Sequence, residues 1–317
     1  MSRLMKTALA LCLALVLGDG VMAEDYPSRR ITLLTPYAPG ASSDAMARVA
    51  AASLSERINQ PVVVENKVGG SSVLATRAAL AAAPDGYTLL FHTNAFHTTA
   101  LSMPEAGYSV DDFVIVAAVG TTAYVLVAPS TVPSGSLESF TAYLKAQGAR
   151  ANYGSLGRGT QQMLLGERFK VAARIGWQEI PYKSGADVIA PLLTNQIQGF
   201  FGTTNFVKQQ PLLKPIAITS NVRSRYLPDI PTFKELGHPE LFEEGWFVVL
   251  APARTPKPII ERLRAEFRQS IRSDKVRKQL ETAMVEPYEG SIDEFVAYTQ
   301  DGARRFAEDI RRFAGAQ

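Results

Sequence analysis

Two short stretches carry the residues of this sequence that could bind a charged small molecule. The first, residues 36–44, reads PYAPGASSD and follows an apolar run over residues 31–34. The second, residues 152–160, reads NYGSLGRGT. Each stretch joins a predicted strand to a predicted helix, so each would leave backbone N–H groups open at the positive end of that helix. Such an arrangement binds anions, for example carboxylates.

Other chemistries find little support in the residue types present. The first stretch has neither the lysine of a phosphate-binding P-loop nor the glycines of a dinucleotide fingerprint. His92, His97 and His238 are too scattered for a metal site, and no nucleophile-elbow pattern surrounds Ser155. We therefore expect no catalytic residue, no metal ion and no cofactor.

Strand and helix patterns alternate along the first third of the chain. Apolar runs predict strands over residues 31–34, 61–66 and 87–91. Helical spacing predicts helices over residues 45–57 and 73–82, and a Ser or Asp of the first stretch is expected to cap the first of them. This alternation is typical of a parallel sheet covered by helices, and hence of an α/β fold.

The same alternation returns around the second stretch. Before it, strands are predicted over residues 113–119 and 124–128, with a break at residues 120–122. Ligands of open parallel sheets bind beyond the carboxyl ends of the strands. If the two stretches belong to different lobes, both can therefore face one cleft and hold a dicarboxylate at its two ends.

The first 23 residues have the features of a secretory signal peptide. Arg3 and Lys6 precede an apolar segment over residues 7–18, which is too short to span a bilayer comfortably. We expect cleavage after Ala23, which would also remove Cys12, the single cysteine. The mature chain would then have no thiol for disulfides, catalysis or metal binding. The net charge is only +3, and nucleic-acid binding would need basic residues clustered on one face, so we expect no nucleic-acid partner.

Several motifs, specific in combination, resemble those of one known family. They are YPSR at 26–29, the first stretch, PVVVEN at 61–66, PDGYTLL at 84–90, TN at 93–94 with His97, the second stretch, PYK at 181–183, LPDIPT at 227–232 and LAP at 250–252. With these motifs the chain resembles the Bug family of periplasmic solute-binding proteins. These TctC-like proteins are the soluble receptors of tripartite tricarboxylate transporters. The resemblance extends from Tyr26 to near the C-terminus.

The resemblance implies the type II periplasmic binding fold, in which two α/β lobes enclose a ligand cleft. Two crossing hinge strands would join the lobes, and we place them near residues 119–127 and 247–251. Lobe one would comprise residues 24–122 plus 247–317, and lobe two residues 123–246. The cleft would close by a hinge motion. We expect a monomer in the periplasm.

The resemblance also implies a function and a set of site residues. The receptor would capture a small carboxylate, either a di- or tricarboxylate or an aromatic acid, and deliver it to membrane subunits of a tripartite tricarboxylate-type transporter. By position in the family motifs, the ligand-binding residues would be Tyr37, Gly40, Ala41, Ser42, Ser43, Thr93, Asn94, Ser155, Gly157, Arg158, Gly159, Thr160, Tyr182, Gly202 and Thr203.

Departures from the family pattern bear on the identity of the ligand. Gly202 stands where an aspartate is common, and the loss of a partner for an ammonium group argues against amino-acid ligands. Leu156 and Met163 replace polar residues, so we expect a carboxylate with an apolar or aromatic body. Arg158 stands where an uncharged residue is usual, and it either grips a carboxylate as a fork or lies in solvent.

Two other classes of function stay open at this point. A ligand sensor of a two-component system would use the same receptor fold, because sensing and transport both need only a surface that changes on closure. A secreted α/β hydrolase would need a nucleophile, a base and an orienting group within reach of one another. The chain has no nucleophile-elbow pattern and only three scattered histidines, so we expect a receptor and no enzyme.

Overall fold

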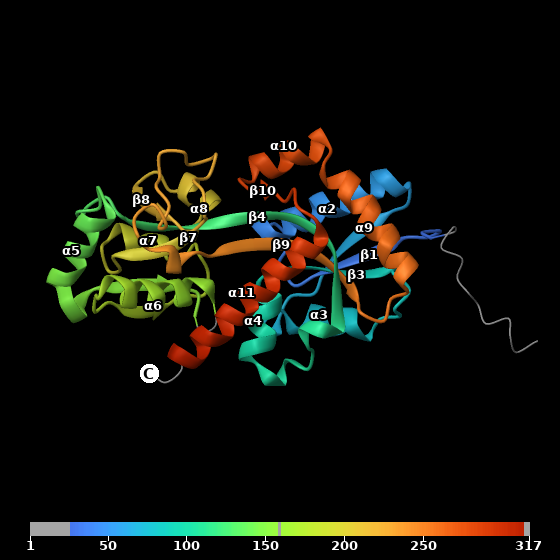
Figure 1. The fold of residues 1–317 in the computed structure, drawn as a ribbon, viewed down its shortest axis with the longest axis horizontal. Coiled ribbons are helices and arrows are strands. Elements are labelled where there is room, and N and C mark those ends of the chain that lie inside the picture. Colours follow the sequence, from blue (N-terminus) through green and yellow to red (C-terminus); the bar gives the residue numbers. More distant parts are fainter. Residues whose placement is uncertain (1–25, 158–159, 314–317) are drawn as a thin grey trace, which may run out of the picture.

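A mixed ten-stranded sheet organises the computed structural model, which describes residues 26–157 and 160–313 (Figure 1). The main strand order is β2-β1-β3-β9-β4-β7-β5-β6, and β8 and β10 each pair with β4. Helices cover both faces of this sheet along the long axis of the molecule (Figure 1). The predicted signal peptide, residues 1–23, lies outside the described residues.

The first sheet region consists of β1, β2, β3, β9, β10 and the first part of β4. Its parallel strands confirm the predicted alternation, with bounds β1 (Ile31–Thr35), β2 (Val62–Asn66) and β3 (Thr88–Thr93). Their connections and flanking helices are α2 (Ser42–Ile58), α3 (Val73–Ala81), α4 (Ala95–Ser102), α9 (Lys257–Ile271), α10 (Asp274–Thr282) and α11 (Ile292–Phe313). Short 3₁₀ turns cover Gly70–Ser72, Pro104–Ala106 and Val110–Asp112.

The second sheet region consists of β5, β6, β7, β8 and the last part of β4. Its strands are β5 (Asn152–Ser155), β6 (Gln178–Pro181), β7 (Gly199–Thr203) and β8 (Leu213–Ile218). β5 runs parallel to both β6 and β7, whereas β7 and β8 run antiparallel to β4. The helices here are α5 (Leu137–Gln147), α6 (Gln161–Ala173), α7 (Ile189–Leu193) and α8 (Thr204–Gln209), with 3₁₀ turns at Gly148–Arg150 and Pro239–Leu241.

Two long strands connect the sheet regions. β4 (Phe113–Pro129) is antiparallel to β9 (Glu244–Pro252) along its first part and to β7 and β8 along its last part. The predicted break at residues 120–122 is therefore wrong. A Cβ at Gly120 would lie 2.6 Å from the carbonyl oxygen of Glu286, because β10 (Glu286–Pro287) pairs at this point. The glycine admits a neighbouring backbone and does not interrupt the strand.

The buried apolar side chains separate into clusters that follow the two sheet regions. Residues of α2 and α9 pack on one face of the first region, and residues of α3 and α4 pack on the other. Separate clusters fill the two faces of the second region. The proposed lobe boundaries, 24–122 plus 247–317 and 123–246, agree with this separation and stay a prediction.

Helix α11 reaches from the first sheet region to the second (Figure 1). Near its start, Phe295 packs against Trp246 in the first region. Near its end, Phe306 and Phe313 pack against Met163 and Leu164 of α6. Met163, one of the two residues that suggested a ligand with an apolar body, has a side chain that is 8% exposed and covered by α11, and it lies outside the described lining of the pocket.

No helix within residues 26–157 and 160–313 combines the length and the apolar character needed to cross a membrane.

Candidate functional site

A pocket of about 630 Å³ lies where the two sheet regions meet. One wall comes from the starts of α2, α3 and α4, and the opposite wall comes from the loop after β5, the start of α6 and the end of β7. The crossing strands contribute the residues between the walls, including Thr122 and Tyr124 of β4 and Trp246 of β9. The volume is typical of a small-molecule site.

Four helices of eight or more residues begin at this pocket. Ser72, Asn94 and Thr160 are the N-cap residues of α3, α4 and α6, and Ser43 lies in the first turn of α2. A helix N-terminus carries unsatisfied N–H groups and about half a positive charge. Four such ends around one cavity favour the binding of an anion.

Neutral polar groups dominate the described lining. Hydroxyls come from Ser, Thr and Tyr side chains and amides from Asn94, Gln161 and Gln162, while none of the described lining residues is charged. Asn94 is 8% exposed, and its Nδ2 atom is buried without a hydrogen-bond partner among the described residues. Leaving a buried donor unpaired costs about 1–3 kcal/mol, so a ligand acceptor that reached this amide would be bound more tightly.

An apolar patch accompanies the polar groups. It is formed by Met103, Leu156, Trp246 and Phe247. Trp246 also packs edge-on against His97, with ring centroids 5.3 Å apart. The pocket can therefore contact the carbon skeleton of a ligand as well as its polar ends.

The turn between β1 and α2 is built around the carboxylate of Asp44, which is 2% exposed. Its Oδ2 accepts from the Gly40 N–H and from Arg48 Nε, both at 2.9 Å, and its Oδ1 accepts from Asn66 Nδ2 at 2.7 Å. Burial would raise the pKa of Asp44, but hydrogen bonds from Arg48, Asn66 and Gly40 hold it below its usual value. The expected side-chain cap is wrong: Ala41 is the N-cap, and Asp44 holds the turn instead.

Replacing Asp44 by asparagine should lower the free energy of unfolding by about 2 kcal/mol, because hydrogen bonds to a charged acceptor contribute about 1.5–3 kcal/mol. The new amide would also present donor hydrogens to other donors. Urea denaturation at pH 7 measures the change. Asp274→Asn is the matched control, since Asp274 is an exposed first-turn aspartate of α10 and should cost less than about 1 kcal/mol. Equal losses in the two variants would contradict the role of Asp44.

A hydrogen-bonded group supports the wall behind Thr93. The Tyr37 hydroxyl lies 2.7 Å from Thr93 Oγ1 and 3.3 Å from His92 Nδ1. Burial lowers the pKa of His92 to about 3 and that of His97 to about 4, so both rings are neutral near pH 7. Burial also raises the pKa of Tyr37. Tyr37 therefore orients Thr93 from behind and does not itself line the pocket.

The turn before α3 holds two serines in an unusual backbone conformation. Ser71 and Ser72 have φ angles of 51° and 78°, which are uncommon for residues other than glycine. Hydrogen bonds from Thr99 Oγ1 and Thr76 Oγ1 to their carbonyls stabilise the turn. Both serines line the pocket. Their strained backbone supports a functional role.

Two predicted site residues of the second wall, Ser155 and Gly202, make close contacts with other residues of the same sheet region. Ser155 is fully buried, where its Oγ donates to Glu179 and accepts from the Gly157 N–H. At Gly202 a Cβ would lie 2.4 Å from the Phe206 ring, so the ring occupies the place that a side chain would need. The absence of an aspartate at position 202 thus has a steric reason in this chain.

The structure brings together some of the predicted site residues. Those that line the pocket are Ser43, Thr93, Asn94, Thr160 and Thr203. Those outside its described lining are Tyr37, Gly40, Ala41, Ser42, Ser155, Gly157, Tyr182 and Gly202. Arg158 and Gly159 lie outside the described residues. Ligand contact stays a prediction for all fifteen.

Sequence reasoning missed several lining residues. Gln161 and Gln162 directly follow the predicted site residue Thr160, and their place in the first helical turn was a usable signal. Thr98 and Ser102 lie one helical turn apart on α4 and follow from Asn94 by helical spacing. Thr122 and Tyr124 could not have been found this way, because the predicted strand break obscured the course of β4.

Within the described ranges, no group of three or more His, Cys, Asp or Glu residues is placed to hold a metal ion.

Comparisons with known proteins place the chain in a family. The model of the tripartite tricarboxylate transporter family receptor (TctC) matches residues 46–314. Protein BugT of Bordetella pertussis is 34% identical over 302 residues, covering 93% of this chain and 90% of BugT. The structure of periplasmic binding protein BugD is similar with a TM-score of 0.76 and 26% identity, covering 90% of this chain and 98% of BugD.

A second solved structure, that of R. palustris Rpa4515 with adipate, has a TM-score of 0.79 and 26% identity, and the match covers 90% of this chain and 98% of that protein. The family model spans most of the chain, and the relatives are matched over nearly their whole length. The chain therefore belongs to the TctC family of tripartite tricarboxylate transporter receptors and is a periplasmic solute-binding protein of the Bug type.

Proposed function

We propose that this receptor captures a small carboxylate in the pocket between its two sheet regions and delivers it to membrane subunits of a tripartite tricarboxylate-type transporter. The observation that carries the proposal is the convergence of four helix N-termini on one hydroxyl-rich pocket whose described lining contains no charged residue. Neutral donors and helix ends can bind an anion without burying a fixed counter-charge. The adipate in the related Rpa4515 structure supports the same ligand chemistry.

In this proposal, ligand binding stabilises the closed arrangement of two lobes, residues 24–122 plus 247–317 and residues 123–246. β4 and β9 are the hinge strands, since they pass from one sheet region toward the other. A ligand that contacts Asn94 on one side and Thr160 on the other binds the closed form more tightly than the open form. That difference in affinity shifts the population toward the shape that the transporter recognises.

The carbon skeleton of the ligand would contact Leu156, Met103, Trp246 and Phe247. This apolar patch supports an acid with an apolar or aromatic body, although Met163 does not contribute to it. The mature receptor would begin after Ala23, act as a monomer in the periplasm and carry no catalytic residue. Its family consists of receptors and not of enzymes.

Native mass spectrometry of residues 24–317, purified from a periplasmic fraction, is the direct experiment. We expect one stoichiometric carboxylic acid, which denaturation releases for identification. If the protein is empty, thermal-shift titration should reveal stabilisation by acids such as adipate, citrate or benzoate and none by the matching amides. A copurified neutral ligand, or equal responses to acids and amides, would refute the anion-binding role of the pocket.

Replacing Asn94 by alanine should weaken carboxylate binding at least tenfold, because a hydrogen bond to a charged acceptor contributes about 1.5–3 kcal/mol. Isothermal titration calorimetry with the acid found above gives the Kd. Asn221→Ala, in an exposed loop outside the described lining, is the control and should leave the Kd unchanged. An unchanged Kd in the Asn94 variant would show that its free amide does not contact the ligand.

A further inference from the structure

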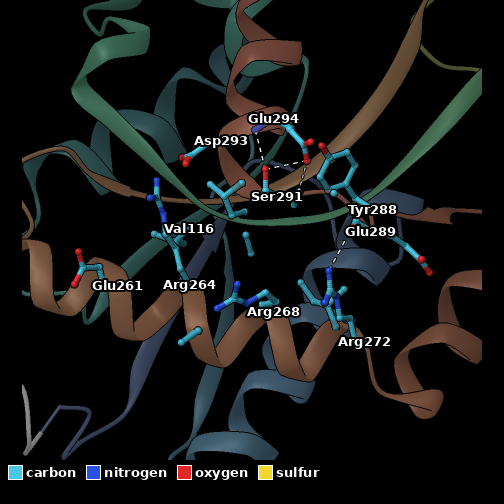
Figure 2. Close-up of a pocket in the computed structure, with 16 residues that line it drawn as sticks. Val116, Glu261, Arg264, Arg268, Arg272, Tyr288, Glu289, Ser291, Asp293 and Glu294 are labelled. Atoms are coloured by element: carbon cyan, nitrogen blue, oxygen red, sulfur yellow. Dashed lines mark hydrogen bonds between the residues drawn. The ribbon is translucent and has the colours of Figure 1, made fainter.

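A second pocket, of about 550 Å³, lies between α9, β4 and the segment that leads into α11 (Figure 2). Its floor is the β4 segment Val116, Ala117 and Ala118, and none of its lining residues belongs to the first pocket. Ile271 and Tyr288 add further apolar surface. The volume again falls in the range of small-molecule sites.

Three arginines line one wall of this pocket. Arg264, Arg268 and Arg272 follow one another at intervals of four residues along a single face of α9, opposite Ser291 (Figure 2). Arg264 donates from Nε and Nη2 to the Ile115 carbonyl at 3.1 and 3.0 Å, and Arg272 donates to the Glu289 carbonyl at 2.9 Å. These acceptors are neutral. Among the described residues, none of the three guanidinium groups forms an ion pair with a carboxylate.

The carboxylates around the pocket are mostly engaged elsewhere. Glu289 pairs with Arg277 at 2.9 Å, and Glu261 lies 3.8 Å from Lys257. Glu294 accepts from the Ser291 N–H at 2.7 Å and from its hydroxyl at 2.9 Å, and these hydrogen bonds cap α11. Asp293 is the remaining acid of the lining. With the paired Lys257 and Arg277 counted, five cations stand against the four carboxylates of the lining, so an excess of one positive charge lies above an apolar floor.

We propose that this pocket is a second binding site, separate from the cleft, for a small organic acid. A carboxylate of the ligand binds Arg268 and the neighbouring guanidinium groups, whose planar donors suit bidentate contacts to carboxylates. The carbon skeleton lies against Val116–Ala118 and Ile271. The start of the long helix α11 adds to the positive potential. This site does not depend on whether the first pocket binds carboxylates.

Arg268→Gln is the informative variant, because Arg268 is exposed and makes no hydrogen bond or ion pair among the described residues, so its loss should not affect folding. Lys278→Gln on the neighbouring helix α10 is the control, since it removes the same charge from an exposed position outside the pocket. Both are made in the Asn94→Ala background to weaken the first pocket. Citrate, adipate and benzoate are titrated by calorimetry at low ionic strength.

We expect at least one of these acids to bind the Asn94→Ala protein with a Kd that rises tenfold or more on adding Arg268→Gln and stays unchanged on adding Lys278→Gln. The acid should also protect Arg268 from modification by phenylglyoxal, as mapped by peptide mass spectrometry. Equal binding by the Arg268 and Lys278 variants, or no binding of any of the three acids in the Asn94→Ala background, would overturn the proposal. Failure of the first pocket would appear separately, as equal binding by the wild type and Asn94→Ala.

Discussion

Replacing Arg168 by methionine should lower the free energy of unfolding by about 3–5 kcal/mol, the usual cost of removing one partner from a buried ion pair. Arg168 lies on α6 and is 9% exposed. Its guanidinium contacts Asp309 of α11 at 2.5 Å and Glu243, just before β9, at 3.1 Å. Methionine fills part of the space but leaves both carboxylates without their cation. Burial already raises the pKa of Glu243, so its charged form depends on Arg168.

This ion-pair cluster also connects the pocket to the crossing strand. Gln161, which lines the pocket, donates to Glu243 at 3.4 Å, and Asp309 comes from the helix that reaches both sheet regions. We therefore expect the Arg168 variant to bind the carboxylate ligand more weakly as well, because α6 and α11 would lose their shared anchor.

Chemical denaturation followed by circular dichroism measures the loss of stability. Lys170→Met is the matched control on the same helix, since Lys170 pairs with Glu167 at 3.3 Å and its side chain is 33% exposed. A partly exposed pair contributes about 0–1 kcal/mol, so the control should change little. If both variants lose the same free energy of unfolding, the buried cluster does not stabilise this fold.

Acid should destabilise the protein through His92 and His97, by about 5 kcal/mol between pH 6.5 and pH 4.5 for the two together. These side chains are 0% and 5% exposed, and burial lowers their pKa values to about 3 and about 4. In the unfolded chain a histidine has a pKa of about 6.5 and takes up its proton first. The stabilisation is therefore fully present above pH 6.5 and is lost as the pH falls toward the folded pKa values.

The free energy of unfolding, measured in urea at several pH values between 7 and 4.5, tests this dependence. Each of the variants His92→Gln and His97→Gln should reduce the slope by about 1.4 kcal/mol per pH unit below pH 6.5. His238→Gln is the control for the substitution itself, because His238 lies outside the core beside Glu240. Carboxyl groups such as Asp44 and Glu244 also contribute to the pH dependence of the free energy of unfolding. Their contribution cancels when each variant is compared with the wild type. A wild-type slope in all three variants would disprove the assignment.

Local patterns determined much of this architecture before any coordinates. The run Ile31–Leu34 became β1 with Ile31 and Leu33 fully buried, because an uninterrupted apolar segment between turns is covered on both faces in a parallel sheet. Thr160 caps α6, as expected for a hydroxyl residue before a helical pattern. The motifs that resemble the Bug family lie in such strand ends and turns, where backbone geometry restricts the choice of residue.

Contacts between distant segments decided the rest. Gly120 looked like a strand break, but the neighbour that requires a glycine there is Glu286, far along the chain. Met163 suggested a ligand with an apolar body, but its side chain packs against Phe306 of α11. Ser155, predicted to contact the ligand, donates its hydroxyl to Glu179 of the adjacent strand, and the sequence around Ser155 did not indicate this partner.

The sequence by itself determined the strand-to-helix turns, the alternating α/β pattern and the family of this protein. Each of these depends on residue types within one turn or one strand, where backbone preferences act locally. Only the tertiary structure decided which polar groups line a cavity and which form hydrogen bonds inside the protein. Asn94 lines the pocket, whereas the hydroxyl of Ser155 donates to Glu179. A side chain has a free donor only when no distant residue supplies an acceptor, and local sequence does not contain that information.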